Sequence, residues 1–297
     1  MAMSPAVSFG VMFRRDFAPE LLAGFAQRVE AGGFDELWVV EDLGYHGGFA
    51  QAVAALASTK RITVGIGISP AVVRNSAFLA MEMATTARMF PGRFHMGLGH
   101  GVDTWIEQVG ATPDSWLSSL KEVTQVAKQL VAGQSVSLVG RHVQLDQVAL
   151  VHPVRAPAAQ PLVSFGVRQP KSIALAREVA DGVILAECSG PAYVAETRTA
   201  IGADSRLTVF LNVTIDVDAA RAEVDKRVSQ GRFASQMRVY DGTDVDLYSE
   251  IIVSGPPETW LSQCARFSDA GADAIVFVPL TTDPPEVLET FIAALGR

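Results

Sequence analysis

Short runs of β-forming residues alternate with longer helical stretches along the whole chain, and this rhythm limits the fold more than any other feature. The runs are rich in Val, Ile and Phe and are mostly apolar, as parallel strands are when both of their faces are buried. Eight parallel strands are the number that closes a barrel. The sequence therefore predicts an α/β fold, a single (β/α)8 TIM-barrel domain over residues 1–297. The eight runs are residues 7–12, 37–40, 62–68, 94–99, 162–165, 182–186, 207–215 and 274–278.

The stretches between the runs have helical periodicity. After the first run a helix is expected to begin at Pro19 and to stop at Gly32-Gly33, with one apolar face made of Leu21, Leu22, Phe25, Ala26 and Val29. The same pattern predicts helices around residues 49–58, 77–90 and 117–131.

Two regions interrupt this rhythm. Residues 133–160 hold two short β-forming segments around Gly140 and then a proline-rich stretch, which predicts a hairpin inserted into the barrel after its fourth helix. Residues 229–250, after the seventh strand, are polar and weakly patterned, and they are longer than an ordinary connection. We expect them to form a mobile lid.

Charge and cysteine content exclude several classes of function. The formal net charge is −8 and the basic residues are scattered, so nucleic acid is not an expected partner. Cys188 and Cys264 are too few for a disulfide framework and lack metal-ligand spacing, so no metal site is expected. No apolar segment reaches the length of a membrane span and the N-terminus lacks a signal-peptide pattern. We therefore expect a cytoplasmic protein with no membrane partner.

Candidate catalytic residues are sought after each run, because the carboxyl ends of barrel strands carry the active site in this architecture. The second run ends in Glu41 and Asp42, two acids suited to proton transfer, with Tyr45 and His46 close behind. In a blander interpretation, one carboxylate faces an arginine or a helix N-terminus and the other faces water.

Small residues end the third and fourth runs. Gly65 and Gly67 would let the backbone approach a flat ring, or would merely relieve packing inside the barrel. The fourth run continues as Gly97-Leu98-Gly99-His100-Gly101-Val102, which resembles a dinucleotide fingerprint but has valine in place of the third glycine. We expect this run to bring His100 against a ligand at the end of the strand, with Asp103 and Trp105 as further pocket candidates.

The loops after the fifth and sixth runs are suited to holding a phosphate. Backbone amides near Gly166 and Val167, the Arg168 guanidinium and the N-terminus of the next helix could act together there. The loop at residues 187–189 could complete this anion site, although Cys188 itself is interpreted as a bystander. Motifs of common hydrolases, zinc proteases and P-loop proteins are missing. A bound cofactor is therefore expected to supply the chemistry.

Several segments resemble the luciferase-like flavin-dependent oxidoreductases. The most specific is residues 90–101, Phe-Pro-Gly-Arg-Phe-His-Met-Gly-Leu-Gly-His-Gly, with support from residues 37–42, 74–82 and 255–260. Within that family the chain is most similar to the deazaflavin-dependent branch, which includes methylenetetrahydromethanopterin reductase and glucose-6-phosphate dehydrogenase. The resemblance implies coenzyme F420 as the cofactor, with FMN as the alternative.

The resemblance also implies where the cofactor is held. In that branch a non-prolyl cis peptide in strand three backs the deazaflavin, and the matching pair here is Gly67-Ile68. The family's phosphate contacts map to Gly166 and Val167 and to residues 187–189. The expected cofactor-binding set is Gly67, Ile68, Gly99, His100, Gly101, Val102, Gly166, Val167, Arg168, Glu187, Cys188 and Ser189.

Two positions depart from the branch. Its members often end strand two in Asp-His, where this chain has Glu41-Asp42, and its sugar-phosphate dehydrogenases carry a glutamate where this chain has Val102. The family mechanism therefore cannot be copied over, and glucose-6-phosphate is not an expected substrate.

Together these observations predict hydride transfer between a reduced deazaflavin and a small organic substrate with a C=N, C=C or C=O bond. Asp42 or Glu41, helped by His100, would polarise or protonate the atom that gains charge. An FMN-dependent two-component monooxygenase served by a cofactor-reducing enzyme is the nearest alternative. A non-catalytic flavin-binding protein is the alternative of another class. A homodimer is expected, because dimers are common among relatives.

Overall fold

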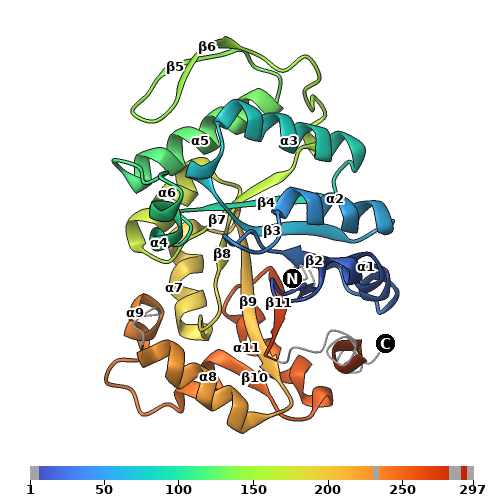
Figure 1. The fold of residues 1–297 in the computed structure, drawn as a ribbon. Helices are drawn as coiled ribbons and strands as arrows, with labels where there is room; N and C mark the ends of the chain where they lie inside the picture. The colour runs from blue at the N-terminus through green and yellow to red at the C-terminus, as the bar shows by residue number, and fades with distance from the viewer. Residues whose placement is uncertain (1–6, 230–233, 281–288, 293–297) are drawn as a thin grey trace.

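The structure, a computed structural model, describes residues 7–229, 234–280 and 289–292. Among these residues eight parallel strands form a closed barrel, in which the last strand pairs back onto the first (Figure 1). Each predicted run forms one barrel strand, so the predicted (β/α)8 barrel is confirmed. In order around the barrel the strands are β1 (Ser8–Met12), β2 (Glu36–Val39), β3 (Thr63–Pro70), β4 (Phe94–Gly99), β7 (Leu162–Gly166), β8 (Gly182–Leu185), β9 (Arg206–Thr214) and β11 (Ala274–Pro279).

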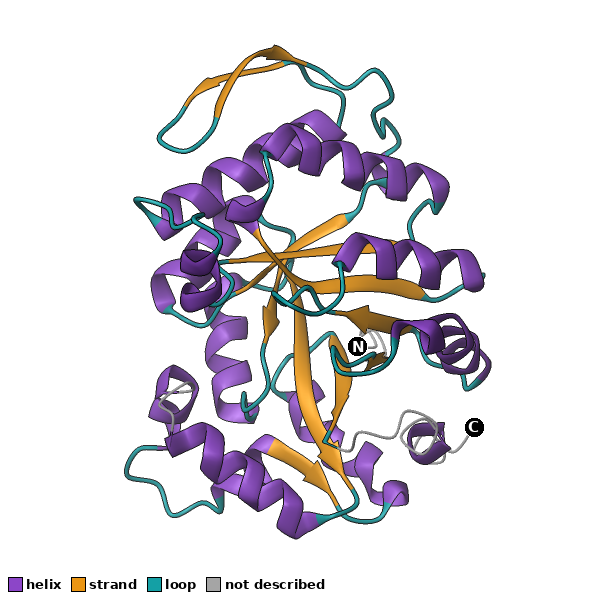
Figure 2. Ribbon diagram, viewed as in Figure 1, coloured by secondary structure: helices purple, strands orange, loops and turns teal. Residues whose placement is uncertain are grey.

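Helices cover the outside of the barrel (Figures 1 and 2). The first, α1 (Leu22–Ala31), buries Leu22, Phe25, Ala26 and Val29, as the periodicity predicts. Leu21 was expected on the same face but is exposed, because it ends the 3-10 turn at Pro19–Leu21 that precedes the helix. Gly33 then reverses the chain at φ +81°, a conformation that glycine adopts without steric cost. The other longer helices are α2 (Gly48–Ser58), α3 (Ser76–Met89), α5 (Trp116–Val131), α6 (Pro170–Val179), α7 (Pro191–Ile201), α8 (Val217–Ser229) and α11 (Trp260–Asp269).

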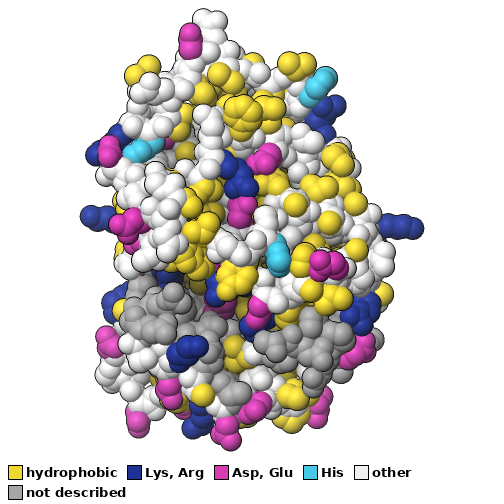
Figure 3. Space-filling model, in the orientation of Figure 1, with side chains coloured by type: hydrophobic (Ala, Val, Ile, Leu, Met, Phe, Trp, Pro, Cys, Tyr) yellow, Lys and Arg dark blue, Asp and Glu magenta, His cyan; other side chains and the backbone are white. Residues whose placement is uncertain are grey.

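The surface is mixed in character. Lys and Arg side chains are scattered over the face shown in Figure 3, which agrees with the lack of a basic block in the sequence. On α3, however, Phe78, Met81 and Met89 are each about half or more exposed, at 66%, 49% and 57%. In the described part of the chain, no helix has the length and apolar character needed to cross a membrane.

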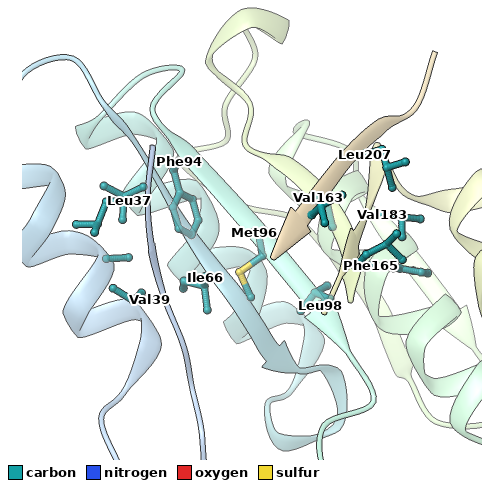
Figure 4. Close-up of a cluster of buried hydrophobic side chains, with 14 of the residues drawn as sticks. Leu37, Val39, Ile66, Phe94, Met96, Leu98, Val163, Phe165, Val183 and Leu207 are labelled. Atoms are coloured by element: carbon teal, nitrogen blue, oxygen red, sulfur yellow. The ribbon is translucent and has the colours of Figure 1, made fainter. Parts of the chain in front are cut away.

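The main hydrophobic core lies between the barrel strands and the surrounding helices. Successive side chains of a strand point to opposite faces, so alternate residues of each strand face outward toward the helices. Figure 4 shows this layer across neighbouring strands, with Leu37, Ile66, Met96 and Phe165 among its members. These side chains are fully buried, which explains why the runs lack polar residues at regular intervals.

The inside of the barrel holds a polar layer at the amino ends of the strands. The Glu36 carboxylate pairs with the Arg206 guanidinium and accepts a hydrogen bond from the Trp38 indole at 2.7 Å. His95 is buried beside Trp38, with its Nε2 atom 2.8 Å from the Ser164 hydroxyl. Burial and the nearby Arg206 charge lower the pKa of His95 to about 3. This end of the barrel is closed and structural, which leaves the opposite end for ligands.

The predicted insertion is present. Strands β5 (Val136–Val139) and β6 (Gln144–Val148) form an antiparallel hairpin that arches over α3 and α5, as Figure 1 shows. The Glu122 carboxylate holds its turn by accepting hydrogen bonds from the amides of residues 141–143.

The region of the predicted lid contains more regular structure than expected. It includes α9 (Ala234–Met237), a 3-10 turn at Arg238–Tyr240 and α10 (Leu247–Ile251), while residues 230–233 lie outside the described residues. Motion of this region stays a prediction. A short strand that the sequence did not suggest, β10 (Ile252–Ser254), follows α10 and pairs with the carboxyl-terminal half of β9.

Candidate active site

A cavity of about 1580 Å³ opens at the carboxyl ends of the barrel strands. This is the end at which the loops after the strands were expected to gather the site. The candidates that line the cavity come from β3, from the last residue of β7 and from the loops after β2, β4, β7 and β8. They are Glu41, Asp42, Gly67, Ile68, His100, Gly101, Val102, Gly166, Val167, Arg168 and Glu187.

The inner wall of the cavity contains the cis peptide bond between Gly67 and Ile68. This is the position that the family resemblance implied. The register of β3 against β4 shifts between Ile66 and Ser69, on either side of the cis bond. Strand β3 therefore bulges where it faces the cavity.

Glycine at positions 65 and 67 is required by packing inside the barrel. A Cβ atom on Gly65 would lie 2.4 Å from Cε3 of Trp38, and one on Gly67 would lie 2.5 Å from Cζ of Phe210. The Trp38 and Phe210 rings themselves contact each other edge to face at 5.3 Å. The packing explanation of these two glycines is thus seen directly, although Gly67 also borders the cavity.

Glu41 is held in a network of hydrogen bonds after β2. Its two carboxylate oxygens accept from the Arg74 guanidinium at 2.6 and 2.7 Å, and Oε2 also accepts from the Ser69 hydroxyl at 2.5 Å. The Gly48 amide, at the start of α2, donates to Oε1 at 3.2 Å. Burial by itself would raise the pKa of Glu41, but the hydrogen bonds from Arg74 and Ser69 and the Arg74 charge outweigh it and lower the pKa. Glu41 is therefore a partly buried carboxylate in its charged form.

Asp42 faces the mouth of the cavity and pairs with Arg15. Its Oδ2 atom accepts from Arg15 Nη1 at 2.7 Å. The Arg15 guanidinium also lies over the Tyr45 ring, 4.8 Å from its centroid, and over the Trp105 ring at 5.7 Å. One cation thereby joins the loops after β1 and β2 to the short helix α4 (Asp103–Gln108).

His100 follows β4 and lines the cavity with one ring nitrogen unused. Its Nε2 atom lies 3.3 Å from the Ser172 hydroxyl in α6, and its ring packs edge to face on Trp116. The buried Nδ1 atom has no hydrogen-bond partner among the described residues. Burial lowers the pKa of His100, and the charge of Asp103 offsets this only in part. The imidazole is therefore neutral near pH 7 and has one nitrogen available for a ligand.

The loop between β7 and α6 places backbone groups at the cavity wall. Gly166 to Gln169 line it, and Pro170 begins α6 without a side chain capping the first amides. The Tyr193 hydroxyl fixes this loop by donating to the Arg168 carbonyl at 2.5 Å. Pro170 has no amide hydrogen and the amides of Ser172 and Ile173 donate to the Gln169 carbonyl. The Lys171 amide and the loop before the helix are therefore the backbone groups placed for an anion, next to a guanidinium.

Three candidates lie outside the cavity lining. A Cβ atom on Gly99 would meet the Gly166 carbonyl and the Ile68 side chain, so this glycine allows strands to pack. Cys188, at φ +65°, is fully buried in a small apolar cluster with Val224 and Ile251. The Ser189 hydroxyl is also fully buried and donates to the Ala186 carbonyl at 2.8 Å. Cys188 and Ser189 thus face away from the space in which an anion could bind.

Some residues at the site were not identified as candidates from the sequence. Arg74, Ser69 and Ser172 act through partners distant along the chain, so no local motif marks them. Phe210 lies in the middle of β9 between apolar neighbours, and no pattern in the sequence singles it out. Trp105, in contrast, was a pocket candidate from the sequence, and Arg15 follows the first predicted strand at the end that carries the site.

Comparison with known proteins shows the family. The profile of the luciferase-like monooxygenase family matches residues 8–274. The chain belongs to this family.

Individual family members resemble the chain over most of its length. A 5,10-methylenetetrahydromethanopterin reductase from Methanolobus tindarius is 24% identical over 268 residues, covering 90% of this chain and 78% of the relative. An F420-dependent glucose-6-phosphate dehydrogenase from Nakamurella multipartita is 26% identical over 315 residues, covering 92% and 91%. Among solved structures, the coenzyme F420 dependent tetrahydromethanopterin reductase from Methanopyrus kandleri has a TM-score of 0.79 at 18% identity, covering 96% and 97%. The solved reductase shares its fold with this chain over nearly the whole length of both.

Proposed function

We propose that this chain is an oxidoreductase that uses coenzyme F420 to transfer a hydride to or from a small organic substrate. The observation that carries the proposal is the wall of the cavity, where the cis peptide Gly67-Ile68 and the unused Nδ1 atom of His100 border the same space. Relatives named as F420-dependent support the choice of cofactor.

The residues present fit such a coenzyme. The bulge of β3 offers an edge against which a flat ring can lie, and the loop from Gly166 to Gln169 offers amides for a phosphate. Arg168 and Lys226 line the same cavity and could attract an anionic tail. When bound, the coenzyme would supply the ring carbon that donates or accepts the hydride.

His100 is the residue we assign to the reacting end of the substrate. Hydride transfer to C=N or C=O leaves charge on the heteroatom, and a hydrogen-bond donor there lowers the barrier. A neutral imidazole with one free ring nitrogen can form that bond and exchange a proton through it. Glu41 is less suited to the task, because its two oxygens are already engaged and its pKa is lowered. We propose that Glu41 positions the loops after β2 and β3.

Asp42 is assigned to orienting Arg15 rather than to proton transfer, because its carboxylate accepts from that guanidinium at 2.7 Å. Val102 lines the cavity as an apolar side chain where sugar-phosphate dehydrogenases of this branch carry an acid. We therefore do not propose glucose-6-phosphate as the substrate.

An FMN-dependent monooxygenase is the second candidate, favoured by the matched family, whose description is luciferase-like monooxygenase. It would need a partner enzyme to reduce the flavin. A binding protein without turnover is the remaining alternative.

Titration of the purified chain with oxidised F420 and, separately, with FMN tests the proposal, with coenzyme fluorescence as the readout. We expect micromolar binding of F420, about −8 kcal/mol, and weaker binding of FMN. His100→Leu removes the free nitrogen and should leave F420 bound but lower the rate of hydride transfer about tenfold, which corresponds to about 1.4 kcal/mol in the activation barrier. Arg141→Gln, on the exposed hairpin turn, is the matched control and should leave that rate unchanged.

The other outcomes separate the candidates. Tighter binding of FMN would favour the monooxygenase. Binding of F420 without anaerobic oxidation of its reduced form by any carbonyl, imine or activated alkene acceptor would favour the binding protein. Binding of neither coenzyme would overturn the proposal.

A further inference from the structure

Arg15 stands out among the charged residues at the mouth of the cavity because of what holds it in place. Its guanidinium lies over two aromatic rings, those of Tyr45 and Trp105, and donates through Nη1 to Asp42. Stacking and one ion pair fix the plane of a guanidinium and reduce the side-chain entropy that a ligand contact would cost.

The neighbouring arginine is used differently. Arg14 donates through Nε and Nη2 to both oxygens of Asp16, at 2.9 and 2.7 Å, and through Nη1 to the Pro279 carbonyl at 2.6 Å. Arg15 has no recorded hydrogen-bond partner for Nε or Nη2 among the described residues, and its side chain is 43% exposed within the cavity lining. The mouth therefore presents one arginine whose donors are used within the protein and one whose donors are available.

We propose that Arg15 anchors a carboxylate group of the substrate. The free edge of a guanidinium matches the two oxygens of a carboxylate, and such forked pairs are among the stronger hydrogen-bonded contacts. A single negative charge fits better than a phosphate dianion, because Asp42 and Asp16 already balance the two arginines. A dianion would meet the repulsion of both aspartates without an unpaired cation to offset it.

The surroundings of Arg15 indicate the rest of the ligand. Val73, Trp105, Ile106 and Val109 give the adjoining wall of the cavity an apolar character. The ligand class is therefore a small monocarboxylic acid with an apolar, preferably aromatic, body. This inference deepens the proposed function by naming the substrate class of the same cavity, and it rests on that function only for calling the ligand a substrate.

Isothermal titration with benzoate and benzamide tests the anchor, because the two probes have nearly the same shape and differ in charge. Each is titrated into the protein alone and into protein saturated with oxidised F420, and phenyl phosphate is the third probe. We expect benzoate to bind at least about tenfold more tightly than either other probe, the preference expected of one charge-assisted fork. Arg15→Gln should abolish this preference, whereas Arg14→Gln should keep it.

A second variant, expected to strengthen benzoate binding rather than weaken it, keeps the test informative if Arg15→Gln fails to fold. Asp42→Asn removes the carboxylate that competes for the same guanidinium, so it should strengthen benzoate binding, which a purely structural ion pair would not do. Equal binding of benzoate and benzamide in both states of the protein, or loss of the preference in Arg14→Gln alone, would overturn the proposal. A stronger response to phenyl phosphate would replace the carboxylate with a phosphate. If these titrations show no preference for benzoate while F420 still binds, the carboxylate anchor is overturned and the proposed function stands.

Discussion

Arg74 donates to both carboxylate oxygens of Glu41, and through this pair the segment after β3 is tied to the segment after β2. The same guanidinium also reaches Glu82 on α3 through Nε at 3.0 Å and lies over the Phe49 ring of α2. One arginine thus holds two helices and two loops at the edge of the cavity.

Loss of either partner of this pair should destabilise the protein. Glu41→Gln or Arg74→Gln leaves a largely buried charge without its partner, and we expect a loss of about 2–3 kcal/mol, below the range for fully buried pairs because Arg74 retains some access to water. Arg74→Lys keeps the positive charge but cannot donate to both Glu41 oxygens as a guanidinium does, so it should reduce the stability by less. Urea denaturation measures the change. Arg141→Gln, whose guanidinium is 4.0 Å from Asp114 and exposed, should change stability by less than about 0.5 kcal/mol, and an equal loss there would contradict the assignment.

Side chains at the glycines of β3 should be poorly tolerated. Gly65→Ala places a methyl group 2.4 Å from Trp38, so we expect a loss of about 1–3 kcal/mol from overpacking. The change should cost less in a Trp38→Leu background, which a double-mutant cycle would show. Gly24→Ala, on the outer face of α1 with open space around it, should instead stabilise by up to about 1 kcal/mol. Additive losses at Gly65 and Trp38 would rule out the contact as the cause.

Acid should destabilise the fold partly through His95. Its pKa in the folded protein is about 3, below the ordinary value of 6.5, so the unfolded chain binds more protons once the pH falls below 6.5. The contribution of neutral His95 to the free energy of unfolding is therefore complete above pH 6.5 and is lost as the pH falls toward 3. The loss between pH 6.5 and about 4.5 is at most about 3 kcal/mol. His95→Gln should flatten this part of the stability profile, whereas His152→Gln, at an exposed position, should not. Identical profiles for wild type and His95→Gln would exclude this role.

The expected homodimer remains a proposal, and the apolar face of α3 is the surface we assign to it. Figure 3 shows hydrophobic side chains gathered on the side that carries α2 and α3, and Phe78 is 66% exposed there. Phe78→Glu should shift the mass measured by light scattering from dimer to monomer, because it places a charge in an apolar contact. Val139→Glu changes an isolated exposed side chain on the hairpin and should have no effect. A monomeric wild type at every concentration tested would remove the proposal.

The sequence predicted the barrel because the same pattern, an apolar run followed by a helical stretch, recurs along the chain for eight strands. Strands buried on both faces are mostly apolar, and no single ambiguous run changes the count. The three residues of β10 and the six of α4 are too short to carry a pattern of their own, so neither was predicted. The turn residues at Gly140 were sufficient to locate the hairpin to within two or three residues at each strand end.

The site was predictable only as far as strand ends could place it. Glu41, Asp42 and His100 do face the cavity, since each follows a barrel strand. The oxygens of Glu41 are engaged by Arg74, which lies 33 residues further along the chain. No local sequence pattern reveals such a pairing. Cys188 and Ser189 were expected near a phosphate because they follow a strand too, but the left-handed backbone at Cys188 is accompanied by burial of both side chains.

The tryptophan that requires glycine in β3 also gives the protein an optical property. The Trp38 indole is wholly enclosed and lies against the glycine that borders the cavity, whereas Trp105 is only partly covered and stands at the mouth beside Arg15. An enclosed indole emits at shorter wavelengths than a hydrated one. Quenching at the blue edge of the emission would therefore report a ring arriving at the floor of the cavity, and quenching at the red edge would report a molecule entering its mouth.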